Sequence, residues 1–346
     1  MAFQRCMGFE FGDLIDLGYA SDTEFFVVSG TPATTTAQRH RSGGGWGGNR
    51  SLRLQAGDEI ALFTYANDVL FEPAGAYRLV AGLLEVRFRD NPHTTTQCAV
   101  TFDAADGKVR VYRGDSGGTL IATSAGAPMT LSTWHWVEYR VTAQNAGTMQ
   151  VYVDGVLVVD TGVADLQPGV FSDFDFMRFV GGTACDCYLD DLVFAEPGTL
   201  VVGQHWYELP KVPIDDSVVE GVPSTGSDNW AMVDEDPPDT ADYVTFTDTD
   251  MDLYTLSALA GSGATVGTVR VAGYAEGEGS IDEWSPVVKS GAATQVSGAH
   301  PAEASWRPAQ DMVPQDPDTG LDWELAAVEA MTAGVQMADS GGGGLG

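Results

Sequence analysis

Positive charge is scarce in this sequence. Its 346 residues include 17 lysines and arginines against 49 aspartates and glutamates, which gives a formal net charge of −32. The lysines are Lys108, Lys211 and Lys289 alone. A surface this negative repels phosphate backbones and anionic headgroups, so nucleic acids and membranes are not expected as partners. The ordinary role of such charge is to keep the protein soluble and apart from its own copies.

Long hydrophobic runs are also missing. No stretch of roughly 18 uncharged apolar residues is present, so no transmembrane helix is expected. The opening residues 1–6 lack a basic segment followed by an apolar run, so we expect no signal peptide. Because no signal peptide is expected, we expect a protein made in a cytoplasm.

Cysteine is sparse, and its spacing favours neither disulfide bonds nor a zinc site. Cys185 and Cys187 are two positions apart, where a mutual disulfide would be badly strained. No Cys-x-x-Cys pair occurs and the histidines are scattered, which argues against zinc. We therefore expect reduced, mostly buried thiols at Cys6, Cys98, Cys185 and Cys187, and no cofactor.

The residues that are abundant in the chain are typical of many short strands. Glycine numbers 42, and Val, Thr, Tyr and Phe are frequent. Apolar and polar residues alternate with a period of two, which places one set on a core and the other on an outer surface. The alternating stretches are 52–54, 84–89, 137–141 and 149–154.

Turn residues stand where hairpins need them. Asp106-Gly107 and Asp154-Gly155 each follow one strand-like segment and precede another, and Asp-Gly favours tight hairpin turns. Nothing in the first 196 residues has the pattern of a long amphipathic helix. Close turns without helices predict a β-sandwich.

The second half differs in composition. Glu196-Pro197-Gly198 breaks the strand pattern, so we expect domains at 1–197 and 198–338 and a flexible glycine-rich tail at 339–346. A proline- and acid-rich stretch, 210–242, is expected to be an irregular connection. Elsewhere in this half we expect strands at 266–275, 286–289 and 335–338 and a short helix at 324–331.

Five segments of the first half, taken in order, resemble the concanavalin A-like, laminin-G-like jelly roll over about residues 1–197. They are specific as a set, although each is weak alone. The expected fold is therefore mainly β: an N-terminal jelly-roll β-sandwich plus a smaller C-terminal β-rich domain with one short helix. The segments are Arg50–Leu54, Leu84–Arg89, Trp134–Val141, Gly147–Gly155 and Tyr188–Phe194.

The ends of the chain resemble virion structural proteins of tailed bacteriophages. The resemblance implies a component of the particle exterior, on the capsid as decoration or along the tail or fibre. It also implies other virion proteins as partners and a homo-oligomer, with a trimer as one arrangement. The matching pieces are Gly8–Asp13, Asn229–Glu235, Asp252–Leu256 and Asp316–Gly320.

One pentapeptide imitates a catalytic motif. Gly114-Asp115-Ser116-Gly117-Gly118 is identical to the sequence around the nucleophile of trypsin-like proteases. That chemistry also needs a histidine to take the hydroxyl proton and an acid to orient the histidine. The upstream histidines, His40 and His93, lie in no suitable setting, so we interpret the pentapeptide as a turn after a strand.

Glycosidases on jelly-roll folds use two carboxylates that project from one strand. The acid pairs here, in Asp234-Glu235-Asp236 and Glu276-Gly277-Glu278, lie in segments with the composition of loops. No catalytic residue is assigned, and we expect the protein not to be an enzyme.

Metal binding has two candidates. Asp248-Thr249-Asp250-Met251-Asp252 begins like a calcium loop, but Leu253 and Leu259 replace the glycine and glutamate that an EF-hand needs, so an EF-hand is rejected. Asp190 and Asp191 are better placed, because jelly-roll modules often bind calcium near the matching strand. The alternative for these two residues is one surface acid and one hydrogen-bonded turn acid.

Aromatic residues supply the ligand candidate. Trp46 lies among glycines in residues 43–48, where it is either a ligand or partner contact or a plug folded back onto the sandwich. Trp134 and Trp136 are expected to pack in the core, and His135 to make a local hydrogen bond.

Three functions remain after this reasoning. The first is a non-enzymatic structural protein on the virion surface. The second is a carbohydrate-binding adhesin that holds a host surface glycan on the jelly roll, and the third is a glycoside hydrolase or depolymerase, which no carboxylate pair supports.

Overall fold

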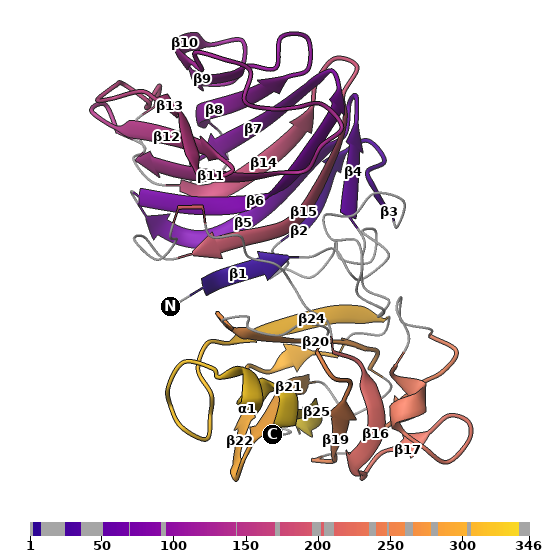
Figure 1. Cartoon of the computed structure of the whole chain (residues 1–346). Coiled ribbons are helices and arrows are strands. Elements are labelled where there is room, and N and C mark those ends of the chain that lie inside the picture. The colour runs from indigo at the N-terminus through magenta and orange to yellow at the C-terminus, as the bar shows by residue number, and fades with distance from the viewer. Residues whose placement is uncertain are drawn as a thin grey trace, which may run out of the picture. The chain divides into compact units, whose positions relative to one another are not determined.

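A computed structural model describes most of the chain. The described residues are 3–7, 25–35, 51–68, 70–90, 95–142, 144–169, 174–195, 202–203, 211–234, 240–247, 249–259, 266–277, 283–302 and 306–338. They are mainly antiparallel strands, which divide into one unit spanning Phe3–Gly43 and Asn49–Glu208 and another spanning Leu209–Gly346 (Figure 1). Trp46, the break at 196–198 and the tail at 339–346 lie outside the described residues.

The first unit contains two sheets. The seven-stranded sheet has the order β10 (Thr119–Thr123), β9 (Val109–Arg113), β8 (Thr96–Asp103), β7 (Leu83–Arg89), β14 (Phe174–Gly181), β5 (Glu59–Asp68), β2 (Phe25–Ser29). The eight-stranded sheet has the order β13 (Val156–Asp160), β12 (Thr148–Val153), β11 (His135–Thr142), β6 (Leu70–Ala81), β15 (Asp186–Ala195), β4 (Ser51–Gln55), β3 (Ala33–Thr35), with β1 (Phe3–Met7) also paired to β15. Strands distant in sequence are neighbours in both sheets, as the jelly-roll expectation requires.

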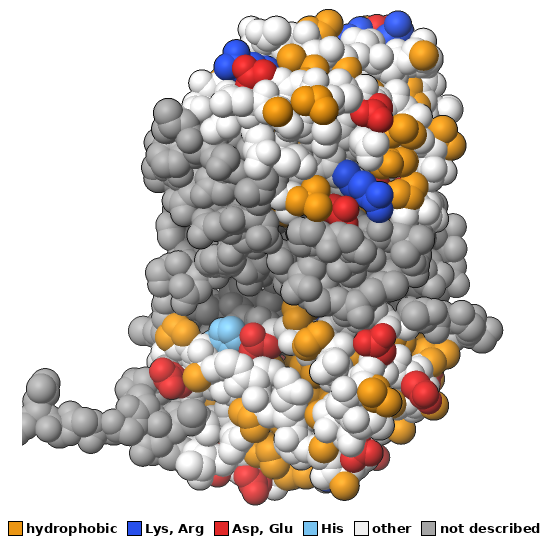
Figure 2. Space-filling model, turned by 90° about the vertical axis from the view of Figure 1, so that its left-hand side faces the viewer, with side chains coloured by type: hydrophobic (Ala, Val, Ile, Leu, Met, Phe, Trp, Pro, Cys, Tyr) orange, Lys and Arg blue, Asp and Glu red, His pale blue; other side chains and the backbone are white. Residues whose placement is uncertain are grey.

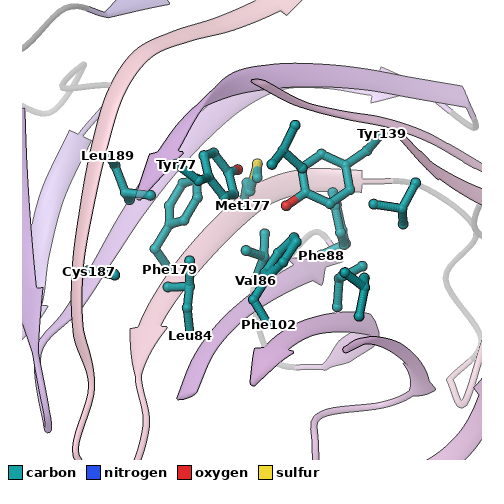
Figure 3. Close-up of a cluster of buried hydrophobic side chains, with 14 of the residues drawn as sticks. Tyr77, Leu84, Val86, Phe88, Phe102, Tyr139, Met177, Phe179, Cys187 and Leu189 are labelled. Carbon is teal, nitrogen blue, oxygen red and sulfur yellow. The ribbon is translucent and has the colours of Figure 1, made fainter. Parts of the chain in front are cut away.

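The core of this unit lies between the two sheets and is rich in aromatic rings. Tyr77 of β6 packs edge-to-face on Phe102 and Phe179 of the other sheet, with ring centroids 5.7 and 5.8 Å apart. Tyr139 of β11 meets Phe88 of β7 in the same way at 5.6 Å (Figure 3). Edge-to-face contacts of this kind stabilise a core beyond its buried area, so the interior is filled by side chains from both layers.

The period-two alternation is confirmed by burial. Along β7, Leu84, Val86 and Phe88 lie in the core, so Glu85, Arg87 and Arg89 project from the outer face. Both expected hairpins are present: β8 pairs with β9 and β12 with β13. Asp154 and Gly155 at the second turn have positive φ, of 50° and 76°, which Asp-Gly tolerates at little cost.

The second unit is a smaller β structure. Its six-stranded sheet has the order β16 (Pro213–Val218), β19 (Met251–Leu256), β25 (Thr332–Ala338), β21 (Glu283–Ser290), β22 (Ala293–Val296), with β23 (His300–Pro301) also paired to β21. Separate pairs are β17 (Val222–Pro223) with β18 (Val244–Thr245), and β20 (Val269–Ala275) with β24 (Arg307–Val313). The helices are α1 (Leu325–Ala330) and the 3₁₀ turn η1 (Trp230–Met232).

A small apolar cluster holds this unit together. Trp323, which precedes α1, is buried against Val313 and donates its indole N–H to the Val313 carbonyl at 2.8 Å. Lys211 donates its ammonium to the carbonyls of Val328 and Glu329 near the end of the helix, at 2.7 and 3.2 Å. The expected helix and closing strand are thus confirmed as α1 and β25.

The expectation for residues 210–242 needs a correction. This stretch is not wholly irregular, because β16 lies inside it and pairs with β19 at the edge of the six-stranded sheet. The strand is acidic and mostly exposed, and it begins at a proline. An edge strand buries little of either face, so it leaves no period-two apolar signal in the sequence.

Of the cysteines whose side chains are described, Cys98, Cys185 and Cys187 are buried and form no disulfide. Burial raises the pKa of the Cys98 thiol, which keeps it protonated and unreactive. No helix among the described residues has the length and hydropathy needed to cross a membrane.

Candidate functional site

The outer face of the seven-stranded sheet carries a row of cross-strand neighbours with binding chemistry. Arg178 of β14 lies opposite Arg87 of β7, which lies opposite Ala99 of β8. The row continues through Tyr112 of β9 to Leu120 of β10, whose side chain is 51% exposed. Two guanidinium groups and one phenol ring therefore stand on the same face of rigid strands.

Two carboxylates accompany these arginines. Glu85 accepts hydrogen bonds from Nε and Nη2 of Arg87 at 2.9 and 3.0 Å. Glu59 of β5 forms an ion pair with Arg178, and both of these side chains are 16% exposed. Burial alone would lower the pKa of Arg87, but its hydrogen bond to Glu85 and the nearby carboxylates raise it. Arg87 and Arg178 are each held in place by an acid.

Arg89 differs from its two neighbours. It projects from β7 on the same face as Arg87, and it forms no ion pair with any described residue. Its Nε is buried without a hydrogen-bond partner among the described atoms. Burial lowers the pKa of Arg89 and the positive charges of Arg178 and Arg87 lower it further, while the carboxylates of Glu59 and Asp90 act in the opposite direction. The face thus contains one guanidinium, that of Arg89, that no described carboxylate holds in an ion pair.

The protease-like pentapeptide, residues 114–118, contacts Glu85 on this face. Ser116 donates its backbone N–H and its hydroxyl to the Glu85 carboxylate, both at 2.8 Å. Gly114 has φ +79°, and a side chain at Gly118 would meet the Arg113 carbonyl at 2.1 Å, so both positions require glycine. The interpretation as a turn after a strand is confirmed, and the described hydrogen-bond partner of the serine hydroxyl is a carboxylate.

The predicted metal residues lie elsewhere. Asp190 and Asp191 on β15 are 5% and 7% exposed, and Asp190 Oδ1 accepts the backbone N–H of Asp191 at 2.9 Å. Asp191 has φ +48°, at an irregularity in the pairing of β15 with β6. Within the described parts of the chain, no three His, Cys, Asp or Glu side chains gather around a common centre. A calcium ion at Asp190 and Asp191 stays a prediction.

The acids of the calcium-like stretch are used inside the second unit. Asp252 is fully buried and accepts hydrogen bonds from the backbone N–H groups of Glu220 and Gly221 at 2.7 and 2.9 Å. Its other oxygen accepts Asn229 Nδ2 at 2.5 Å and the Tyr254 hydroxyl at 3.1 Å. These bonds tie the loops to β19, which is a structural use of the carboxylate.

His135 makes the local contacts that the sequence predicted. Its Nδ1 lies 2.7 Å from Asp154 Oδ2, and its Nε2 accepts the backbone N–H of Thr130 at 2.9 Å. Trp136 is fully buried, but not in the core between the sheets as expected. Because Val137 and Tyr139 point inward, Trp136 lies on the outer side of the eight-stranded sheet.

The known structures that are similar to this chain resemble it in its β-sandwich fold. No family model and no curated protein matches the chain. The carbohydrate binding module CBM66 from Bacillus subtilis is 17% identical, covers 50% of this chain and 96% of its own, and has a TM-score of 0.36. A Bacillus subtilis protein of unknown function with a galectin-like fold is 10% identical, covers 56% and 97%, and has a TM-score of 0.37.

Another similar structure is the alginate lyase Aly36B, at 15% identity and a TM-score of 0.30, covering 42% of this chain and 81% of its own. At such identities and scores the likeness concerns the β-sandwich and says nothing of what this chain binds. None of these findings points to a phage particle.

Part of this site could be predicted from the sequence. The alternation in 84–89 predicted that Glu85, Arg87 and Arg89 share a face. It could not place Arg178 and Glu59 beside them, because these residues come from strands far away in the chain.

Proposed function

We propose that this protein is a non-catalytic carbohydrate-binding module that holds its ligand on the outer face of the seven-stranded sheet. The observation that carries the proposal is a row of cross-strand neighbours. Arg178 pairs with Arg87, and Ala99 separates Arg87 from Tyr112. A guanidinium offers several fixed N–H donors to sugar oxygens, and a phenol ring offers an apolar face to a sugar ring. Strands hold both at fixed spacing, which limits the entropy lost on binding.

The carboxylates on this face support a binding role. Glu85 accepts four hydrogen bonds from the described residues, all from Arg87 and Ser116, so both of its oxygens are occupied as acceptors. Glu59 is paired with Arg178. A glycosidase needs two carboxyl groups that reach the scissile bond, one of them as a proton donor. Carboxylates that form ion pairs with guanidinium groups instead hold the N–H donors of a binding surface in place.

Placement on a phage particle stays a prediction from the sequence resemblance, as do other virion proteins and further copies of this chain as partners. A host surface glycan is the partner that fits both that resemblance and the proposed site.

The proposal is tested on the full-length protein with a broad glycan array, followed by calorimetric titration of the strongest hits. Tyr112→Ala should weaken binding about tenfold, because a stacking contact contributes about 1.4 kcal/mol or somewhat less. The matched control is Tyr152→Ala on the eight-stranded sheet, where the ring stacks on Arg140 at 5.9 Å. Absence of any glycan ligand, or equal losses in the two variants, would contradict the proposal.

A further inference from the structure

Three arginines lie close together on one part of the sandwich. Arg87 is the cross-strand partner of Arg178, and Arg89 is the next residue of β7 on the same face. Like charges at such spacing raise the free energy of the folded state unless anions compensate them, most of all where water is partly excluded. Lysine and arginine are rare in the chain, and on the face drawn in Figure 2 those described form a few separate spots.

Described carboxylates form ion pairs with two of the three arginines, and Glu59 and Asp90 act on Arg89 only at longer range. Glu85 is hydrogen-bonded to Arg87, and Glu59 is paired with Arg178. Arg89 has neither kind of contact with a described acid, and its buried Nε lacks an acceptor.

The acid next to Arg89 in the chain is already used. Asp90 is fully buried and accepts the backbone N–H of Thr95 at 2.9 Å and Nε2 of Gln97 at 3.2 Å. Those bonds engage both oxygens of the Asp90 carboxylate, which forms no ion pair with Arg89. A partly buried guanidinium without a described ion pair, close to two that carboxylates hold, is suited to bind an anion.

Resting on the carbohydrate-binding function proposed above, we propose that the ligand is an acidic glycan and that a uronate carboxylate binds at Arg89, beside the guanidinium groups of Arg87 and Arg178. The planar carboxylate matches the fork of a guanidinium and accepts two parallel N–H bonds. A neutral hydroxyl would leave Arg89 without an ion-pair partner when the ligand displaces water.

The overall charge makes this inference easy to test. A net charge of −32 repels a polyanion at long range, so non-specific attraction does not produce binding to an acidic polymer. Binding of an acidic glycan by this chain therefore requires a local cationic site.

The experiment titrates the full-length protein with three oligouronates of different stereochemistry and with the same oligomers after reduction of their carboxyl groups to alcohols. At least one oligouronate should bind at least about tenfold more tightly than its reduced form, and Arg89→Gln should remove most of that difference. Arg89→Lys, which keeps the charge but not the fork, should have an intermediate effect.

Arg110→Gln is the matched control. Arg110 lies on the same sheet face in β9 but is paired with Asp103 and Asp106, so its loss should change the affinity by less than about twofold. Thermal unfolding of each variant checks that it is folded.

The outcomes separate the two proposals. If the reduced oligomers bind as tightly as the acidic ones, and Tyr112→Ala weakens both, the carboxylate site is wrong and the carbohydrate-binding function stands. If Arg89→Gln and Arg110→Gln weaken oligouronate binding equally, the assignment to Arg89 is wrong. If no acidic, reduced or arrayed glycan binds, both proposals are overturned.

Discussion

The two outer faces of the sandwich use the same residue types in different ways. On the eight-stranded sheet, the ring of Tyr188 lies between two guanidinium groups, with Arg53 at 5.7 Å and Arg78 at 5.4 Å from the ring centroid. Arg53 is also bonded to Asp186 at 2.8 Å, and Arg78 donates to the Ser132 carbonyl at 3.0 Å. Each guanidinium there has both an acceptor and an aromatic partner.

Further along the eight-stranded sheet, other charged side chains on the outer face also have partners. Arg140 pairs with Glu72 at 3.3 Å and stacks on Tyr152, while Glu138 accepts the backbone N–H of Gly203. On the seven-stranded sheet, by contrast, Arg89 lacks an acid and Tyr112 stands in a row with guanidinium groups that are occupied by carboxylates. A face whose described guanidinium groups all have acceptors contributes stability, whereas a face where one of the described guanidinium groups lacks an ion pair is suited to a ligand.

This contrast predicts that the two tyrosines differ in what they contribute. Tyr188 is 8% exposed, so Tyr188→Ala should lower the free energy of unfolding by about 3 kcal/mol through lost packing and lost cation–π contacts. Tyr112 is half-buried, and Tyr112→Ala should cost about 1 kcal/mol or less while it weakens glycan binding. Urea unfolding of the full chain measures both, and equal stability losses would remove the distinction between the faces.

A second prediction removes the carboxylate partner of Arg87. Glu85→Gln removes the charge that holds Arg87 and Ser116, and should cost about 1–3 kcal/mol of stability. Because Arg87 then lacks its carboxylate, the affinity for an acidic glycan should rise even as the melting temperature falls.

The control for Glu85→Gln is Glu72→Gln, which removes the acid facing Arg140 on the eight-stranded sheet. It should lower stability without changing glycan affinity. A rise in affinity in both variants would indicate a general effect of net charge, not of the site.

The sequence predicted the fold more fully than the site, for a physical reason. Alternation of apolar residues is local, so the strands and the outward direction of Arg87 and Arg89 could be inferred from 84–89. Sheet order is not local: Ser116 reaches Glu85 across 31 positions of sequence, and Arg178 becomes the neighbour of Arg87 only through the pairing of β14 with β7. Edge strand β16 was missed because it buries too little to leave a pattern.

The smallest predicted effect concerns a carboxylate on the internally matched face. Burial raises the pKa of Glu138, against the opposing effects of the Gly203 N–H and Arg140. The folded state therefore keeps a proton that the unfolded chain has already lost, and Glu138 costs stability as the pH rises above the ordinary pKa of about 4.3.

Glu138→Gln should therefore match the wild-type melting temperature at pH 4 and exceed it at pH 7, as measured by calorimetry across that range. Asp160→Asn is the control of opposite sign, because hydrogen bonds from the Gly162 N–H and from Gln150 lower the pKa of Asp160. Its stabilising contribution is present above the ordinary pKa and is lost as the pH falls, so this variant should be less stable than the wild type at pH 7 and approach it in acid. A melting difference for Glu138→Gln that is constant with pH would mean that burial does not raise the pKa of this carboxylate.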